Sequence, residues 1–305
     1  MTQVFIDGSA GTTGLRIWER LEKRSDLELI RLPEESRKDA AVRCEAINAA
    51  DIAFLCLPDA AAKEAAAMVK NPKVKIIDTS TTHRTNDDWA YGFSELSDAH
   101  REKIANASRI ANPGCHASGF IASVYPLVQN GIIQKSDIVT AYSLTGYSGG
   151  GKSLIAEYED ENRDVRHESH RIYGTNLMHK HLPEMQKICG LEQAPLFSPI
   201  LGDFYAGMAT TILLQADCHA VHDILSAHYE GQKLISVSPL GGDESVIYAS
   251  TYAGLDTMRI VVSGHEMQTM VTAVFDNLGK GASGAAIQNM NIILGVDETT
   301  GLNLK

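Results

Sequence analysis

The stretch VFIDGSAGTTGLRI, residues 4–17, joins a short apolar run to a glycine-rich turn and a helical pattern. Residues 4–6 are typical of a buried strand. Gly8, Gly11 and Gly14 then form the pattern GxxGxxG, which brings backbone N–H groups to a helix N-terminus, where a pyrophosphate is attracted. We therefore predict a dinucleotide-binding turn rather than a ligand-free one. Its residues are Gly8, Ser9, Ala10, Gly11, Thr12, Thr13 and Gly14.

The first part of the chain alternates apolar runs with helical patterns. The expected strands are residues 4–6, 27–30, 52–57, 75–78 and 109–111. The expected helices are residues 12–24, 38–48, 59–70 and 94–107, with Asp59 and Ser94 as N-caps. Strands separated by helices predict an open α/β domain of the Rossmann type, with a parallel sheet and right-handed crossovers.

The pattern changes at about residue 137. Longer β segments with few helices between them predict a second, α+β domain with a largely antiparallel sheet. These segments are DIVTAYSLTG (137–146), LFSPILG (196–202), ATTILLQA (209–216), SVIYAST (245–251) and MRIVVSG (258–264). A Gly- and Ala-rich helical tail follows. We predict a dinucleotide-binding domain of residues 1–114, joined by the tail 283–305. Residues 115–282 form the predicted catalytic, substrate and self-association domain.

Composition restricts the class of protein. The 305 residues are enough for two domains, and 44% are hydrophobic. The net charge of −11 argues against a general nucleic-acid binder. Apolar runs are shorter than the ~20 residues that span a bilayer. The chain begins without a secretory pattern. Five scattered cysteines fit reduced thiols, so we expect a cytoplasmic protein without a membrane or nucleic-acid partner.

The segment after the second expected strand bears on the choice of cofactor. It reads IRLPEESRKD and carries Arg31, Ser36, Arg37 and Lys38 alongside Glu34 and Glu35, where an acidic ribose ligand is usual. A basic cluster favours the 2′-phosphate of NADP, and a solvated charged loop is the alternative. Pro58 closes the third strand at the carboxyl edge of the sheet, where ligands bind.

Cys115 follows an Asn-Pro-Gly turn in IANPGCHASGF, residues 110–120. Residues 116–127 have helical character, which places the thiol at or just before a helix N-terminus. The positive end of the helix dipole favours a thiolate, and the same amides can hold an oxyanion. A buried structural cysteine is the alternative, and we assign that role to the other four cysteines.

The segment NLMHKHLPEMQ offers partners for a thiolate. His179 and His181 alternate, so they share a face of an extended segment. Pro183 suits the first turn of a helix, and Glu184 follows it. A histidine beside a thiol is the acid/base partner that cysteine chemistry needs. No third ligand at a recognisable spacing accompanies the two histidines, so we predict no metal.

Two loops offer anion contacts. The glycine run GYSGGGKS contains Ser148 and Gly149, predicted to contact the cofactor, and Lys152, predicted to contact the substrate. The segment DTSTTHR ends in Arg84, which is suited to a bidentate contact with a carboxylate. A turn and a surface arginine are the alternatives.

Together these motifs resemble the N-acetyl-γ-glutamyl-phosphate reductase family in its shorter form. The resemblance extends over nearly the whole chain. It rests on GSAGTTG, IIDTSTTHR, YGFSEL, NPGCHAS, GYSGGGKS, HKHLPE and KGASGAAIQNMN. It implies a semialdehyde dehydrogenase-like fold and reduction of the acyl phosphate of N-acetylglutamate to a semialdehyde with NADPH, in arginine biosynthesis. Longer members read NPGCYPT and SGAGR where this chain has NPGCHAS and SGGGK, which bears on the phosphate contacts at 148–152.

The resemblance also implies roles for single residues. Cys115 is the nucleophile that forms a thioester, and His179 or His181 protonates the thiohemiacetal oxygen. Glu184 belongs to the same motif. Arg84 holds the substrate carboxylate. The remaining assignments are Tyr173 as an active-site tyrosine and Asn289 beside the nicotinamide.

Other functions compete with this one. Aspartate-semialdehyde dehydrogenase has the same architecture, although HKHLPE argues against it. A lysine-pathway reductase of carrier-bound aminoadipyl phosphate shares more motifs. A non-catalytic NADP-binding sensor and a cysteine hydrolase are more distant alternatives. We expect His116 to be a weaker candidate base than the 179–181 pair, because the side chain of an adjacent residue points elsewhere. We also expect a homo-oligomer, a dimer or a tetramer.

Overall fold

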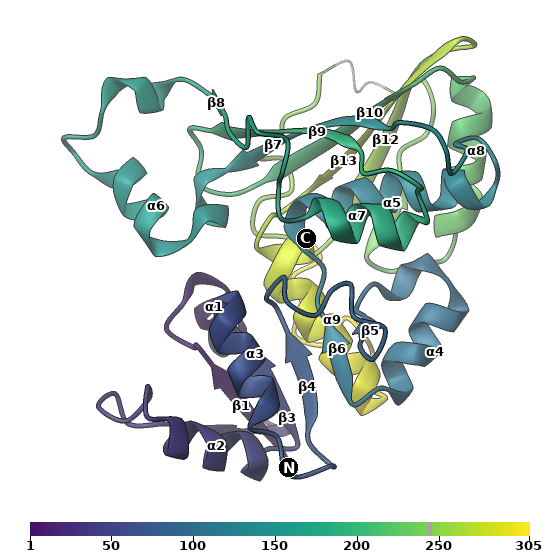
Figure 1. Ribbon diagram of the computed structural model, residues 1–305. Coiled ribbons are helices and arrows are strands. Elements are labelled where there is room, and N and C mark those ends of the chain that lie inside the picture. Colours follow the sequence, from purple (N-terminus) through teal and green to yellow (C-terminus); the bar gives the residue numbers. More distant parts are fainter. Residues whose placement is uncertain (243–245) are drawn as a thin grey trace. The chain divides into compact units, whose positions relative to one another are not determined.

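The computed structural model describes residues 1–242 and 246–305, and the chain forms two compact units (Figure 1). The first comprises Met1–Gly114 and Ala282–Leu302, and the second comprises Cys115–Gly281 and Asn303–Lys305. The last three residues therefore lie outside the first unit, to which the predicted tail 283–305 assigned them. They join the second unit because the Asp256 N–H donates to the Asn303 carbonyl oxygen at 2.7 Å. In return, the Asn303 N–H donates to the Asp256 carboxylate at 2.8 Å.

In the first unit, six strands form a sheet in which every neighbouring pair is parallel. Their order is β2-β1-β3-β4-β6-β5. The strands are β1 (Thr2–Asp7), β2 (Leu27–Ile30), β3 (Ile52–Leu55), β4 (Lys75–Asp78), β5 (Ala90–Tyr91) and β6 (Arg109–Ala111). The chain passes from β1 to one side and then returns to place β3 on the other. Ligands bind such sheets at the carboxyl ends of the strands where the order reverses, here β1 and β3.

Helices cover both faces of this sheet (Figure 1). They are α1 (Thr12–Leu21), α2 (Ala40–Ala49), α3 (Asp59–Ala67), α4 (Asp98–Asn106) and α9 (Gly284–Leu294), with a 3₁₀ turn η1 (Ser94–Leu96). Strand β1 is buried on both sides. Val4 packs in a core cluster with α1, α4 and α9, whereas Phe5 packs in a second cluster with α2 and α3. Burial on both faces accounts for the continuous apolar runs that predicted a parallel sheet.

The structure corrects two predicted N-caps. Pro58 occupies the N-cap of α3, and Asp59 is the first helical residue. The Asp59 carboxylate instead accepts hydrogen bonds from the Thr81 N–H and hydroxyl. Ser94 lies inside η1, and Ser97 caps α4 by accepting from the His100 N–H at 3.3 Å. Both errors arise because an Asp or Ser near a helix start has more than one N–H within reach.

In the second unit, seven strands form a mixed sheet in the order β11-β12-β13-β10-β7-β9-β8. Four of the six neighbouring pairs are antiparallel, which agrees with the largely antiparallel prediction. The strands are β7 (Thr140–Gly146), β8 (Arg171–Ile172), β9 (Leu196–Gly202), β10 (Met208–Leu214), β11 (Ile235–Val237), β12 (Met258–His265) and β13 (Gln268–Phe275).

The helices of this unit include α5 (Cys115–Gln129), which packs across β10 and β13. A side chain at Gly119 would place its Cβ 2.6 Å from the Thr210 Cβ and 2.9 Å from the Phe275 ring, so glycine lets the helix lie close to the sheet. Helices α7 (Leu182–Cys189) and α8 (Cys218–Tyr229) contact α5. The remaining elements are α6 (Gly151–Glu159), η2 (Tyr147–Gly150), η3 (Val165–Glu168) and the π-helical turn η4 (Gly279–Ser283).

One predicted strand of the second domain is wrong. Residue 245 of SVIYAST lies outside the described residues, and residues 246–251 form bends and turns rather than a strand. Val246 and Tyr248 are 63% and 69% exposed, so their alternation reflects no buried face. The sequence pattern also predicted no element at β13, which pairs with both β10 and β12. Within the described residues, no helix is both long and apolar enough to cross a bilayer.

Candidate active site

The glycine turn of the first unit depends on the absence of side chains. Gly8 has a φ of +86°, and a Cβ there would lie 2.2 Å from the Cys56 carbonyl oxygen at the end of β3. A Cβ at Gly14 would lie 2.3 Å from the Gly8 carbonyl oxygen. The Gly11 N–H donates to that same oxygen at 2.9 Å and closes the turn. The backbone thus passes tightly from β1 to α1, where Thr12 and Thr13 form the first helical residues.

A cleft of about 570 Å³ opens beside this turn. Its lining includes Gly8, Ser9, Ala10, Arg31, Arg37 and Lys38, which the sequence assigned to the cofactor or its 2′-phosphate. Trp18 also lines the cleft, and the Arg31 guanidinium carbon lies 4.5 Å from the centre of its ring. Other predicted cofactor residues of this unit lie outside the lining of the cleft: Gly11, Thr12, Thr13, Gly14, Ser36, Pro58 and Asn289.

The cleft has the features that a dinucleotide requires. Glycines that leave no room for a Cβ form its turn, a helix N-terminus follows, and four cationic side chains line it: Arg31, Arg37, Lys38 and Arg43. The Thr12 hydroxyl oxygen is buried at this helix start without a hydrogen-bond partner among the described residues. At the end of β1, Asp7 is buried and paired with Arg43 at 2.9 Å. Burial raises the Asp7 pKa, and the Arg43 contact opposes this effect.

Arg84 and Asn289, predicted to contact substrate and nicotinamide, both lie in the first unit and both contact Asn112. The Arg84 guanidinium donates to the carbonyl oxygens of Asn112 at 2.9 Å and Thr79 at 3.0 Å. The Asn289 amide donates to the Asn112 side-chain oxygen at 3.1 Å and to the Gly92 carbonyl at 3.0 Å. These contacts fix the segment that leads to Cys115. The predicted ligand contacts of Arg84 and Asn289 stay predictions.

In the second unit, Cys115 is the first residue of α5, as the turn Asn-Pro-Gly predicted. Its side chain is partly exposed, and none of the five cysteines forms a disulfide. A Cβ at Gly281 would lie 3.0 Å from the Cys115 Cβ, so the middle of η4 passes beside Cys115. Cys115 therefore combines partial exposure with the positive end of a 15-residue helix.

Three histidines and a tyrosine form a cluster near the start of α5. The centre of the His179 ring lies 4.8 Å from that of His181 and 5.2 Å from that of His116. His116 and His181 are 5.7 Å apart. Tyr173 follows β8, and its hydroxyl lies 2.7 Å from His116 Nε2. The structure thus brings the predicted His179, His181 and Tyr173 together.

His116, expected to be a weaker candidate base than the 179–181 pair, lies against that pair. Its ring contacts both members of that pair, because the first turn of α5 faces β7 and the loop before α7. It is 3% exposed, and its Nδ1 lies 2.8 Å from the Ser143 hydroxyl on β7. Burial, followed by His179 and Lys180, lowers the pKa of His116 to about 3. This residue is therefore a neutral imidazole at neutral pH.

The neighbouring groups are also shifted by their surroundings. Burial, followed by Lys180, lowers the pKa of His179 to about 4. Burial raises the pKa of Tyr173, and the negative charge of a Cys115 thiolate raises it further. The tyrosine therefore stays protonated, and its pKa depends on whether the Cys115 thiol is ionised. Perturbed groups of this kind gather at catalytic sites.

The other predicted residues of this unit lie on neighbouring elements. His181 is the N-cap of α7, Pro183 occupies its first turn as predicted, and Glu184 is 2% exposed in that turn. Ser148 lies in η2, is fully buried, and accepts a hydrogen bond from the Asn277 amide at 3.0 Å. Gly149 is next to it, and Lys152 is exposed in the first turn of α6.

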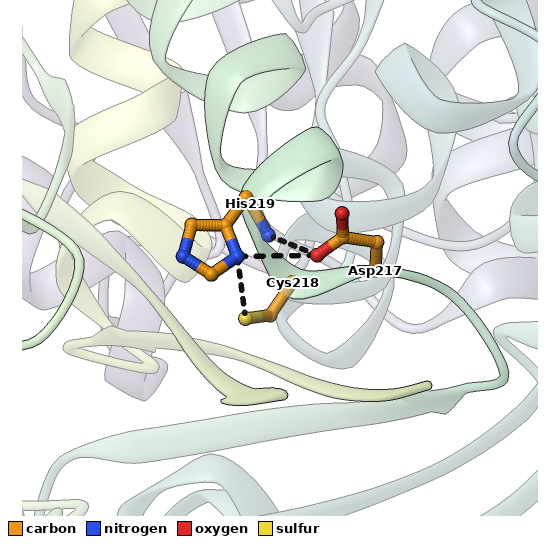
Figure 2. A group of neighbouring side chains, drawn as sticks. All are labelled: Asp217, Cys218 and His219. Atoms are coloured by element: carbon orange, nitrogen blue, oxygen red, sulfur yellow. Dashed lines mark hydrogen bonds and ion pairs between the residues drawn. The ribbon is translucent and has the colours of Figure 1, made fainter. Parts of the chain in front are cut away.

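One group of potential metal ligands exists among the described residues, at the start of α8 (Figure 2). Asp217 caps the helix by accepting from the His219 N–H at 3.0 Å, and the same oxygen lies 3.2 Å from His219 Nδ1. Cys218 is 3% exposed. The Asp217 carboxylate is thus engaged by the helix start, whose partial positive charge disfavours a cation. The absence of a metal requirement stays a prediction.

Comparison with known proteins places each unit in a family. Residues 3–107 match the semialdehyde dehydrogenase NAD-binding domain, and residues 115–277 match the semialdehyde dehydrogenase dimerisation domain. The chain is therefore an oxidoreductase of the semialdehyde dehydrogenase class, and its first unit is a nicotinamide-dinucleotide domain as predicted.

Within that class, the chain belongs to the N-acetyl-γ-glutamyl-phosphate reductase family. It is 45% identical to the reductase of Burkholderia ambifaria, over 96% of each chain. Identity to the reductase of Sinorhizobium fredii is 47%, over 96% of this chain and 98% of the other. For reductase 2 of a Nostoc species it is 42%, over 98% and 99%. The family predicted from the motifs is confirmed.

Solved structures agree on the fold. Aspartate semialdehyde dehydrogenase II of Vibrio cholerae has a TM-score of 0.72 at 18% identity, covering 97% of this chain and 98% of the other. The Francisella tularensis enzyme has a TM-score of 0.72 at 14% identity, covering 96% and 100%. The predicted fold class, a Rossmann-type domain with an α+β domain, is confirmed.

Proposed function

We propose that this protein reduces N-acetylglutamyl 5-phosphate to N-acetylglutamate 5-semialdehyde and phosphate with NADPH, in arginine biosynthesis. The observation that carries the proposal is Cys115 at the start of α5 beside Tyr173 and the histidine cluster. This site lies in a chain 42–47% identical over nearly its whole length to N-acetyl-γ-glutamyl-phosphate reductases.

The first chemical step is acyl transfer to Cys115. The thiol proton passes to a histidine, the thiolate attacks the acyl carbon, and the carbon–oxygen bond to phosphate breaks to leave a thioester. The departing phosphate oxygen takes the proton from the histidine. We assign this proton to the pair His179 and His181, whose ring centres lie 4.8 Å apart.

The second step is reduction of the thioester. The glycine turn and the cleft beside it would hold NADPH, which would supply the hydride for this reduction. The carbonyl oxygen then carries a negative charge, which the first N–H groups of α5 and the Tyr173 hydroxyl stabilise. The oxyanion collapses, the carbon–sulfur bond breaks, and the aldehyde leaves. The released thiolate takes a proton from water. Arg84 and Lys152 are the proposed contacts for the substrate carboxylate and phosphate.

The cations beside the cleft support NADPH rather than NADH. Arg31, Arg37 and Lys38 follow β2, where NAD-specific domains place an acidic residue against the ribose. We expect kcat/KM with NADPH to exceed that with NADH by roughly 10- to 100-fold, in keeping with ~1.5–3 kcal/mol for a charged hydrogen bond. Equal values would refute this assignment.

The experiment that tests the function is the reverse reaction, phosphate-dependent oxidation of the aldehyde with NADP⁺. Wild-type protein is expected to use N-acetylglutamate semialdehyde and to discriminate against aspartate semialdehyde. Cys115→Ser is expected to abolish turnover while NADPH binding is retained. Cys44→Ser, on α2 of the first unit, is the matched control and retains activity. A Cys115→Ser protein with near-normal turnover, or preference for aspartate semialdehyde, would overturn the proposal.

We further propose that the second unit mediates self-association in the cytoplasm. It matches a dimerisation domain, and Tyr142 and Leu213 on the paired strands β7 and β10 are 36% and 52% exposed. Five cysteines without a disulfide suit a reducing compartment. Sedimentation equilibrium at micromolar concentration tests the association, and a monomer would contradict it.

A further inference from the structure

A buried chain of hydrogen bonds runs from the sheet of the second unit to the tyrosine beside Cys115. The Thr210 hydroxyl lies 2.8 Å from the Ser143 hydroxyl, which lies 2.8 Å from His116 Nδ1. His116 Nε2 lies 2.7 Å from the Tyr173 hydroxyl. Ser143 and Thr210 are directly opposite each other on β7 and β10, so the register of these two strands fixes the first hydrogen bond of this series.

Both ring nitrogens of His116 are therefore used. A neutral imidazole has one N–H donor and one acceptor nitrogen, so His116 donates in one of its two hydrogen bonds and accepts in the other. When Thr210 donates to Ser143 and Ser143 donates to Nδ1, the Nε2–H donates to the Tyr173 oxygen. The Tyr173 hydrogen is then left for another acceptor. The reverse direction would direct the Tyr173 hydrogen back into His116.

Burial keeps this chain in place. Ser143 and Thr210 are fully buried, and His116 is 3% exposed, so water does not compete with its contacts. The ring is also held from its sides by His179 and Phe197, at centre distances of 5.2 and 5.3 Å. Buried hydrogen bonds of this kind fix side-chain orientation.

We propose that His116 is a positioning residue that holds the Tyr173 hydroxyl with its hydrogen directed at the acyl oxygen on Cys115. This inference rests on the proposed function. Tyr173 donates to the oxygen as negative charge develops on it, and His116 acts only through Tyr173. His116 transfers no proton to substrate, because both of its nitrogens are occupied.

A double-mutant cycle tests this coupling. In His116→Asn the amide reaches only the Nδ1 position, whereas in His116→Gln it reaches the Nε2 position and can still contact Tyr173. We expect His116→Asn to lower kcat by about 10-fold or more with KM little changed, approaching the loss in Tyr173→Phe. His116→Gln is expected to recover most of the rate. In the Tyr173→Phe background, His116→Asn is expected to have no further effect.

Several controls separate positioning from loss of structure. His222→Asn removes a partly buried histidine of α8 that contacts the Ser238 carbonyl, outside the His116 hydrogen-bond series, and it is expected to retain activity. Ser143→Ala breaks the chain one step earlier and is expected to give a smaller loss that also disappears in Tyr173→Phe. Circular dichroism and melting curves establish that each variant is folded.

Acylation of Cys115 by p-nitrophenyl acetate makes the test independent of the proposed substrate, because it needs neither NADPH nor an acyl phosphate. If wild-type protein fails with N-acetylglutamyl phosphate, the proposed function is wrong, and the same cycle in acylation still tests His116. Losses in His116→Asn and Tyr173→Phe that multiply in the double variant would overturn the inference. Wild-type rates in folded His116→Asn would do so too.

Discussion

Gly8→Ala tests the glycine turn most directly. Gly8 has a φ of +86°, and an added Cβ would lie 2.2 Å from the Cys56 carbonyl oxygen, well inside the 3.0 Å below which such contacts essentially do not occur. A left-handed conformation costs an alanine ~1–2 kcal/mol. The clash is with backbone at the end of β3, which has no flexible side chain to move, and overpacking of this kind adds ~1–3 kcal/mol.

The displaced turn also loses contacts with the cofactor. Loss of one or two backbone hydrogen bonds to a charged pyrophosphate, at ~1.5 kcal/mol each, weakens NADPH binding by about 10- to 100-fold. Quenching of tryptophan fluorescence measures this affinity, because Trp18 lines the cleft. Chemical denaturation measures the stability of the same variant.

Gly131→Ala is the matched control for this variant. Gly131 has a φ of +73° with no atom within 4 Å of an added Cβ, so it carries the conformational cost without the clash. We expect Gly131→Ala to lose ~1–2 kcal/mol of stability and to bind NADPH normally. Gly8→Ala protein with wild-type affinity and stability, or the same loss in both variants, would refute the steric argument.

Two further predictions concern the second unit. Gly281→Ala places a Cβ 3.0 Å from the Cys115 Cβ, so we expect kcat to fall by about 10-fold with NADPH affinity unchanged. Gly242→Ala, whose Cβ meets only ordinary contacts, serves as control, and equal rates in the two variants would contradict the reasoning. Burial holds the pKa of His116 near 3 and that of His179 near 4, whereas an ordinary histidine has a pKa of 6.5. At a pH under about 6.5, the unfolded chain therefore binds more protons than the folded chain. The free energy of unfolding is therefore expected to fall as pH decreases from about 6.5 toward 4, and to fall less steeply in His116→Asn. Urea unfolding followed by far-UV circular dichroism measures it, and equal pH dependence in wild type and variant would argue against buried neutral histidines.

Local signals were sufficient for much of the first unit. Short apolar runs such as residues 4–6, each followed by a turn and a helical pattern, are typical of strands buried on both faces. Glycine is needed at positions 8 and 14 because a side chain there would clash with backbone in or next to the same turn. Cys115 was placed correctly at a helix start, because a Pro-Gly turn determines where the following helix begins. The strand predicted at residues 246–251 was wrong, because alternation of apolar and polar residues does not show whether another element covers the apolar face.

The local structure around the candidate residues was therefore predictable, and their contacts with distant segments were not. Sequence alone determined the nucleotide turn, the thiol at a helix N-terminus and the histidine pair, because each depends on residues within a few positions. Only the tertiary structure placed His116 among the other rings, since its partners Ser143, Tyr173 and Thr210 come from separate strands and loops. Likewise, Arg84 and Asn289 meet at Asn112 only because β4, β6 and α9 pack together. Contacts between distant segments are set by sheet register and burial, which no local spacing encodes.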